Sequence, residues 1–323
     1  MKKIAVLDSF AIREGDLDWA PLAEMAEEVV IYPRTANEQA VERIGDADAA
    51  ILNKVWIGDE VLDACPQLRW IGLTATGTDS LDLAACRRHG VPVANVPAYS
   101  TDSVAQLAFA LLLELCQCPG RFDAAIRGGF WQAGIPAAYG VLPQLELAGK
   151  TLGVVGYGAI GRRAAGLGRA FGMRVLVHTR TVRTQWQQDG VQFVELDKLL
   201  AQSDAITLHC PATADTRGLL NGRSLSRCKP GVRIVNTARG ALVDEAAMAA
   251  ALRCGQVGGY AADVVGKEPI APDNPLLGAP NTILTPHIAW ATPEALGRLA
   301  REVCENLRAF LQGEARNIVN GPF

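Results

Sequence analysis

The chain of 323 residues has few of the features that mark membrane, metal or nucleic-acid proteins. It has no apolar run of membrane-spanning length and no Cys-x-x-Cys pair, and its 31 Lys and Arg do not outnumber its 34 Asp and Glu. A nucleic-acid surface needs clustered positive charge, and a structural zinc site needs closely spaced Cys or His ligands. We therefore expect no nucleic acid, no membrane and no metal among the partners of this protein.

Cysteine is present but scattered. Of the eight cysteines, only Cys116 and Cys118 lie close together, and the others are spread through apolar or helical segments. This usage is typical of reduced core thiols rather than of a disulfide framework. The apolar residues 4–7 form too short a run for a signal peptide, and Asp8 closes it. The sequence thus predicts a first buried strand and a cytoplasmic location.

Two series of alternating strand and helix patterns follow each other, one over residues 1–98 and one from Thr151 onward. A chain of this length usually forms two domains, and strands separated by short helices predict parallel sheets of an α/β fold. Strands are expected at residues 3–7, 29–32, 49–52, 70–73, 92–95, 152–155, 174–177, 205–208, 232–236, 260–263 and 282–284. Helices are expected at residues 17–26, 38–44, 59–64, 81–88, 101–118, 160–171, 196–201, 244–253 and 293–311, with a loop over 127–143.

The most specific local pattern is Gly-x-Gly-x-x-Gly at residues 156–161, directly after a predicted strand and directly before a predicted helix. Gly156 permits the tight turn, Gly158 lets the backbone approach a pyrophosphate, and Gly161 allows close helix–strand packing. The helix N-terminus offers N–H groups and a positive dipole to phosphates. The pattern predicts a dinucleotide site. The alternative is a tight turn without a ligand.

The second strand of this series is followed by His-Thr-Arg-Thr-Val-Arg at residues 178–183. An acidic residue at this place would accept the ribose hydroxyls of NAD(H), and none is present. Arg180 and Arg183 could instead grip a 2′-phosphate. We expect NADP(H) in preference to NAD(H), with NAD(H) still possible. The alternative is a solvated basic loop.

Among the four histidines, His287 stands out because it follows the last predicted strand, at the strand ends where parallel sheets bind ligands. Carbonyl reduction needs a proton donor, which imidazole can supply, and a carboxylate on its other nitrogen would fix the tautomer. A guanidinium would bind a substrate carboxylate. Glu268 and Arg239 also follow strands of this series. Each residue alone is more often structural, but the three together form a plausible site.

With these residues and several further motifs, the chain resembles the D-isomer-specific 2-hydroxyacid dehydrogenase family over essentially its whole length. The resemblance lies in GVVGYGAIGRR (153–163), TADTRGLLN (213–221), VNTARGALVDEAAM (235–248), YAADV (260–264), KEP (267–269) and TPHIAWAT (285–292). It implies that Arg239, Glu268 and His287 carry catalysis and that Asp263 holds the nicotinamide carboxamide. The resemblance, the glycine pattern and the arginine pattern together give a set of expected cofactor-binding residues. These are Gly156, Gly158, Ala159, Ile160, Gly161, Thr179, Arg180, Arg183, Pro211, Thr216, Thr237, Ala238 and Asp263.

Two stretches resemble the glycerate dehydrogenases, also called hydroxypyruvate or glyoxylate reductases. These are Asn53-Lys54 and residues 95–105. The loop at residues 74–79 is similar to the family's substrate loop, whose backbone N–H groups receive the carboxylate, although Thr78-Asp79 departs from the usual pair. The expected substrate-binding residues are Asn53, Thr76, Gly77, Arg239 and His287. Formate is disfavoured because the related formate dehydrogenases carry Gln where this chain has Glu268.

The resemblance also implies an architecture of two doubly wound Rossmann-like domains with parallel sheets and an active-site cleft between them. The dinucleotide-binding domain is expected at residues 99–288, and the substrate domain at residues 1–98 plus 289–323. The helix 101–118 and the loop 127–143 would build a homodimer. Trp131 and Tyr139 are candidates to reach a neighbouring active site, but packing within the loop is their more expected role. The alternatives are a dehydrogenase for a bulkier 2-oxo acid and, in a different class, a dinucleotide-sensing binding protein.

Overall fold

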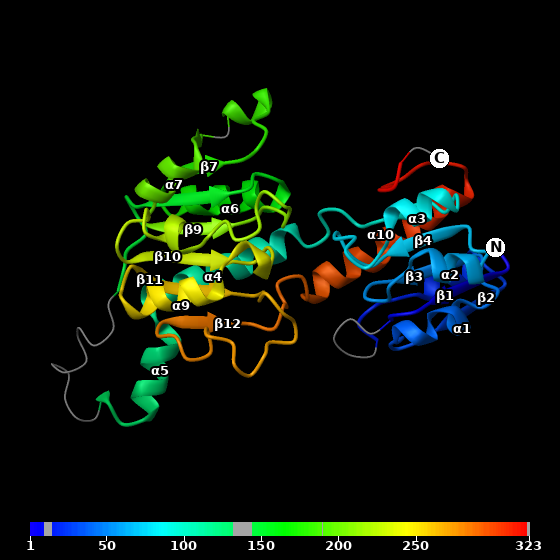
Figure 1. The fold of residues 1–323 in the computed structure, drawn as a ribbon, viewed down its shortest axis with the longest axis horizontal. Helices are drawn as coiled ribbons and strands as arrows, with labels where there is room; N and C mark the ends of the chain where they lie inside the picture. Colours follow the sequence, from blue (N-terminus) through cyan, green and yellow to red (C-terminus); the bar gives the residue numbers. More distant parts are fainter. Residues whose placement is uncertain (10–14, 132–143, 189, 322–323) are drawn as a thin grey trace. The chain divides into compact units, whose positions relative to one another are not determined.

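The computed structural model describes residues 1–9, 15–131, 144–188 and 190–321, so that Tyr139 lies outside the described residues. The chain divides into two compact units (Figure 1). Unit 1 comprises Met1–Ser100 and Trp290–Phe323, and unit 2 comprises Thr101–Ala289. Each unit contains one sheet of parallel strands, which confirms the predicted α/β class with two parallel sheets.

Unit 1 is built on a five-stranded sheet in the order β2-β1-β3-β4-β5. Its strands are β1 (Lys3–Val6), β2 (Glu28–Ile31), β3 (Ala49–Leu52), β4 (Trp70–Leu73) and β5 (Val93–Ala94). Its helices are η1 (Ala20–Glu24), η2 (Asn37–Gln39), α1 (Ala40–Ile44), α2 (Asp59–Ala64), α3 (Leu83–Arg88) and α10 (Pro293–Leu311). Side chains alternate between the two faces of each strand, so Ala50 and Leu52 pack with α1–α3 while Ala49 and Ile51 pack with α10. Both faces of the sheet are therefore covered.

One expected helix of unit 1 is wrong. Residues 17–26 form only the short 3₁₀ helix η1, which has a proline near its start. Besides Leu17, the buried side chains are Trp19, Leu22 and Met25, and these three are spaced three residues apart. That spacing suits a helix of three residues per turn, in which such positions lie on one face, rather than an α-helix.

Unit 2 is built on a seven-stranded sheet in the order β12-β11-β10-β9-β6-β7-β8. Its strands are β6 (Thr151–Val155), β7 (Arg174–His178), β8 (Gln192–Phe193), β9 (Ala205–Leu208), β10 (Val232–Asn236), β11 (Val257–Ala262) and β12 (Thr282–Leu284). Its helices are α4 (Thr101–Gln117), α5 (Pro119–Arg127), α6 (Ala159–Ala170), η5 (Thr184–Gln188), α7 (Leu196–Gln202), α8 (Gly222–Leu225), η6 (Gly240–Leu242) and α9 (Glu245–Arg253). Helices α4 and α6 cover one face, and α7, α8 and α9 cover the other.

The strand order of unit 2 reverses between β6 and β9, because the chain runs outward through β7 and β8 and then returns to β9 on the other side of β6. Ligands of open parallel sheets bind beyond the carboxyl ends of the strands at such a reversal. The glycine pattern follows β6, and Pro211 lies just after β9. The fold therefore places two predicted cofactor segments at the position where a ligand is expected.

The long helix of unit 2 ends as expected, but a second helix follows it. Pro119 stops α4 and stands at the first turn of α5, a position where its missing N–H is harmless. Helix α4 packs on α6, β10 and β11, and many of its side chains are buried. Within the described residues no single helix meets the length and hydropathy needed to cross a membrane, and only α4 and α5 together, bent by 56°, do so.

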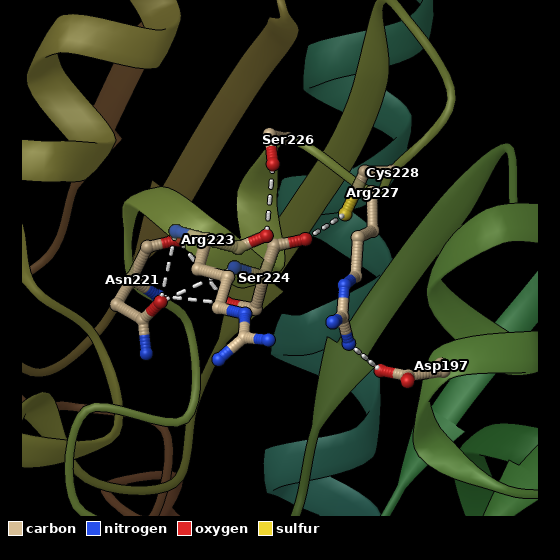
Figure 2. Close-up of polar contacts among 7 residues, drawn as sticks. All are labelled: Asp197, Asn221, Arg223, Ser224, Ser226, Arg227 and Cys228. Atoms are coloured by element: carbon tan, nitrogen blue, oxygen red, sulfur yellow. Dashed lines mark hydrogen bonds and ion pairs between the residues drawn. The ribbon is translucent and has the colours of Figure 1, made fainter.

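The stretch at 213–221 ends in a helix cap. The side-chain oxygen of Asn221 accepts the N–H groups of Arg223 and Ser224 at 3.0 and 3.2 Å, and Ser224 Oγ accepts the N–H of Asn221 at 2.8 Å (Figure 2). Arg227 forms an ion pair with Asp197 of α7 (Figure 2). The contacts of Asn221 satisfy N–H groups in the first turn of α8, so the end of the stretch 213–221 has a structural role.

Candidate active site

The three predicted catalytic residues all follow strands on one side of the unit 2 sheet. Arg239 follows β10, Glu268 lies in the segment after β11, and His287 follows β12. These strands are adjacent and parallel, so their carboxyl ends meet at one edge of the sheet. The fold therefore brings the three segments to the same edge.

His287 and Glu268 form a direct pair. The imidazole Nδ1 lies 2.7 Å from Glu268 Oε2, and the other carboxylate oxygen accepts the N–H of Val265 at 3.3 Å. The two side chains are 39% and 37% exposed, so the pair is open to a small molecule. The contact fixes the ring with Nδ1 toward the carboxylate and leaves Nε2 as the nitrogen that can exchange a proton with a ligand.

Asp263 holds the segment that carries His287. Its carboxylate accepts the Thr285 hydroxyl at 2.6 Å and the N–H groups of Ile288 and Ala289 at 2.9 and 2.8 Å. Its carbonyl accepts the N–H of His287 at 2.8 Å. The side chain is buried. The sequence suggested a role toward the nicotinamide, and reasoning from sequence missed this loop-holding role, because the hydrogen bonds form only once β11 and β12 are adjacent.

The turn that carries Arg239 is fixed from within. Asn236, fully buried at the end of β10, donates from Nδ2 to the carbonyl of Arg239 at 2.9 Å and accepts the N–H of Ala238 at 3.0 Å. Arg239 Nη1 donates to the carbonyl of Ala238 at 2.8 Å. The guanidinium is thus presented from a rigid turn and remains half-buried.

The glycine motif has the geometry of a phosphate-binding turn. A Cβ on Gly156, whose φ is +92°, would lie 2.6 Å from the backbone N of Cys210, and one on Gly161 would lie 2.1 Å from the carbonyl of Gly156. A Cβ on Gly158 would meet nothing within 4 Å. The first and third glycines are therefore required by packing inside the protein, whereas the space beside Gly158 is open to a ligand.

The residues present fit a dinucleotide. Helix α6 begins with Ala159 and Ile160 after Gly158 and has no side-chain cap, so its first N–H groups are available to phosphate oxygens. The hydroxyl of Thr237 is buried without a hydrogen-bond partner in the part of the chain that the structure describes. Thr237 and Ala238 lie after β10 on the same sheet edge as the glycine turn. An unsatisfied hydroxyl and an open cradle are what a bound polar ligand would complete.

The remaining predicted cofactor residues follow β7 and β9. Thr179 is half-buried, and Arg180 and Arg183 are exposed. The Arg183 guanidinium stacks on the Trp186 ring at 5.2 Å, and Arg162 lies 5.9 Å from the same ring. Thr216 donates its hydroxyl to the carbonyl of Pro211 at 2.7 Å and so closes the loop after β9.

A pocket of about 550 Å³ lies beside β7. Its lining includes the predicted residues Thr179 and Arg180, together with Lys198 and Glu195 of the segment around α7. Reasoning from sequence missed Lys198, which no motif marks, because the two segments are brought together only by the fold. The pocket offers two cations and one carboxylate.

The three predicted substrate residues of unit 1 also lie beyond strand ends. Asn53 follows β3, and its N–H donates to Asp8 Oδ2 at 3.0 Å. Thr76 and Gly77 follow β4, and the Thr76 hydroxyl donates to the carbonyl of Val96 at 2.8 Å. Because β3 and β4 are neighbouring parallel strands, these loops share one edge of the unit 1 sheet.

Comparison with known proteins shows the family of this chain. Residues 109–289 match the sequence family described as D-isomer specific 2-hydroxyacid dehydrogenase, NAD binding domain. The chain is 42% identical to hydroxypyruvate reductase from Blautia hydrogenotrophica over 98% of its length and 99% of that protein. It is 39% identical to glycerate dehydrogenase from Methylorubrum extorquens, covering 87% and 88% of the two chains.

A solved structure is similar over nearly the full chain. D-lactate dehydrogenase from Aquifex aeolicus, in complex with NAD and lactic acid, superposes with a TM-score of 0.86 at 30% identity, covering 99% of this chain and 100% of that one. Sequence motifs, sheet topology and these relatives agree, and a nicotinamide dinucleotide is the cofactor of the class. The chain belongs to the D-isomer-specific 2-hydroxyacid dehydrogenase family of oxidoreductases, which act on CH–OH groups.

Proposed function

We propose that this enzyme interconverts a small 2-oxo acid, hydroxypyruvate or glyoxylate, and the corresponding D-2-hydroxy acid, with NADP(H) preferred over NAD(H). The observation that carries the proposal is the 2.7 Å contact between His287 Nδ1 and Glu268, which leaves the other imidazole nitrogen for the substrate. The activities named for the hydroxypyruvate reductase and the glycerate dehydrogenase described above support the choice of substrate.

In this proposal Arg239 binds the substrate carboxylate and polarises the carbonyl oxygen. His287 donates a proton to that oxygen during reduction and removes it during oxidation. Glu268 fixes the imidazole tautomer and stabilises the imidazolium form. A bound nicotinamide supplies or accepts the hydride. Asn53 and the backbone around Thr76 and Gly77 in unit 1 contribute further contacts to the substrate.

The dinucleotide is proposed to lie along the carboxyl edge of the unit 2 sheet. Gly158, Ala159 and Ile160 at the N-terminus of α6 would hold its pyrophosphate, and Thr237 and Ala238 would hold its nicotinamide side. Pro211 and Thr216 provide the wall after β9. The Asp263 carboxylate already accepts hydrogen bonds from the segment that carries His287. Its main role in this proposal is therefore to support that segment.

The preference for NADP(H) is supported by positive charge near the end of β7. Arg180 has no hydrogen-bond or ion-pair partner among the described residues, and it lines a pocket with Lys198. Guanidinium groups match phosphate oxygens well. Glu195 lines the same pocket and could accept ribose hydroxyls, which is the feature that favours NAD(H).

The first experiment measures initial rates of NADPH and NADH oxidation with glyoxylate, hydroxypyruvate, pyruvate and phenylpyruvate. We expect turnover with the small acids and a loss of kcat/KM of about 10²- to 10⁴-fold in His287→Ala. A preference for phenylpyruvate would support a bulkier substrate. Dinucleotide binding without turnover of any acid would overturn the enzyme assignment and support a sensing protein.

Cofactor preference is tested with Arg180→Ala and Arg183→Ala. Loss of a charge-assisted phosphate contact should lower kcat/KM for NADPH by about tenfold or more and change that for NADH much less. Arg223→Ala is the matched control, because Arg223 is exposed and its guanidinium has no partner among the residues described (Figure 2). Equal losses with both dinucleotides would contradict the assignment of a 2′-phosphate site.

We also propose that the enzyme is a cytoplasmic homodimer that associates through the α4–α5 region and the segment 127–143, of which residues 132–143 lie outside the described part of the chain. Ile126 and Trp131, at this end of unit 2, are 40% and 57% exposed. Apolar side chains of this size gain free energy when a partner covers them. Light scattering after size exclusion should give twice the mass of the chain, and a monomer mass at all concentrations would contradict this proposal.

A further inference from the structure

The carboxylate of Glu245 is bound by the segment that carries Glu268. Glu245 is the first residue of α9. Its Oε1 accepts the N–H of Gly266 at 2.7 Å, and its Oε2 accepts Nδ2 of Asn274 at 2.9 Å. Gly266 precedes Glu268 and Asn274 follows it. One carboxylate therefore fastens the segment to α9 on both sides of Glu268.

The same segment is packed tightly against the turn that carries Arg239. A Cβ on Gly240 would lie 2.0 Å from the carbonyl carbon of Val265 and 2.4 Å from the N of Gly266. Val265 also donates its N–H to Glu268 Oε1 at 3.3 Å. The backbone at 265–266 is thus confined between the Arg239 turn, Glu245 and Glu268 itself.

The groups that face Glu245 are both hydrogen-bond donors. Asn274 is buried, and its side-chain oxygen accepts the N–H of Leu276 at 3.0 Å, so its amide NH₂ must point to Glu245. A carboxylate can accept from both donors, whereas a glutamine has one acceptor and one donor group. Glu245→Gln would therefore set an NH₂ against one of the two donors and release one side of the segment.

We propose that Glu245 is a positioning residue for catalysis: by fastening the segment 266–274 it holds Glu268 at hydrogen-bonding distance from His287. The inference rests on the proposed roles of Glu268 and His287. Glu245 takes no part in proton transfer and touches neither substrate nor cofactor. Its effect on the reaction passes through the position of Glu268.

The test compares wild type with Glu245→Gln, Glu268→Gln and the double variant Glu245→Gln/Glu268→Gln. Glu245→Gln should lower kcat by about 10- to 100-fold, since small displacements of catalytic groups have effects of this size. The dinucleotide Kd should change less than about twofold, because the predicted contacts to the dinucleotide are all made by other residues. The midpoint of the pH profile of kcat should shift in the same direction as in Glu268→Gln.

Non-additivity separates a positioning role from a general loss of structure. If Glu245 acts through Glu268, the double variant should be no less active than Glu268→Gln alone. A compensating variant, Glu245→Gln/Asn274→Asp, provides a further test. In it the glutamine NH₂ faces a carboxylate, so all donors regain acceptors. This variant should recover most of the kcat lost in Glu245→Gln, and its pH profile should return to that of wild type.

Glu294→Gln is the matched control, because Glu294 lies in the first turn of α10 and has no hydrogen-bond or ion-pair partner among the described residues. If Glu245→Gln does not fold, Asn274→Ala removes one attachment alone and should still lower kcat several-fold. A kcat within twofold of wild type for the folded variant, or fully additive losses in Glu245→Gln/Glu268→Gln, would overturn the inference. Inactive wild type would instead refute the proposed function.

Discussion

His287 has a backbone φ of +56°, a region that residues other than glycine seldom adopt. The surrounding hydrogen bonds sustain it, since the carbonyl of Asp263 receives the N–H of His287 and its carboxylate receives the next two N–H groups. Strained residues of this kind persist where neighbouring structure determines them, often at functional sites. The unusual conformation thus agrees with the catalytic role proposed for the imidazole.

His209 makes a prediction about pH and stability. Burial lowers the pKa of its imidazole from 6.5 to about 4, and Nδ1 has no partner in the described part of the chain. The unfolded chain binds the proton more readily, so the stabilisation is present above pH 6.5 and is lost as pH falls toward 4. Over this window wild type should lose about 1–3 kcal/mol more unfolding free energy than His209→Gln.

Urea unfolding of the cofactor-free protein at several pH values measures this difference. His178→Gln serves as the control for loss of an imidazole from the same unit. Parallel pH dependences for wild type and His209→Gln would contradict the lowered pKa of the imidazole.

At the scale of elements, a methyl group added at each of three glycines of the β6–α6 region should have three different effects. Gly161→Ala would set a Cβ 2.1 Å from the Gly156 carbonyl and should destabilise the protein by about 2–4 kcal/mol. Gly158→Ala meets nothing within 4 Å, so it should keep the melting temperature but weaken dinucleotide binding. Gly166→Ala, inside α6 and also unobstructed, should stabilise by about 0.5–1 kcal/mol.

Thermal unfolding and dinucleotide titration of the three variants check this order. Gly166→Ala is the control for adding a methyl group to α6. Unchanged dinucleotide affinity in Gly158→Ala would argue against a pyrophosphate at this turn.

At the scale of the whole molecule, unit 1 is assembled from both ends of the chain. The buried Asn320, close to the C-terminus, accepts the N–H of Val93 at 2.9 Å and donates to the carbonyl of Val91 at 2.8 Å. Asn320→Ala would leave two backbone groups beside β5 without partners and should cost about 2–4 kcal/mol of stability. Because the dinucleotide residues belong to unit 2, the dinucleotide Kd should stay within twofold of wild type.

Chemical unfolding together with dinucleotide titration tests this separation. Glu314→Ala, at an exposed position of the same C-terminal segment, is a milder comparison. A loss of dinucleotide affinity equal to the loss of stability would show that the two units do not respond independently.

Local patterns in the sequence were enough to predict the fold class and many of the strands and helices. The alternation of strand and helix predicted two parallel sheets, and residues 59–64, 70–73, 205–208, 232–236, 282–284 and 293–311 form the expected elements at the expected bounds. The glycine pattern and the residues Arg239, Glu268 and His287 could be selected because strand ends of a parallel sheet meet at one edge. Periodicity failed at residues 17–26, where a 3₁₀ spacing resembles a helical one.

The contacts that hold the site were decided by the tertiary structure alone. Glu245 lies 21 residues from Gly266 and 29 from Asn274. Asp263 meets Ala289 across 26 residues, and Asn320 meets Val93 across 227. Hydrogen bonds require donor and acceptor within about 3 Å at a favourable angle. Residue types and spacings name the groups able to react, but only strand order and the paths of the loops bring their supports to that distance.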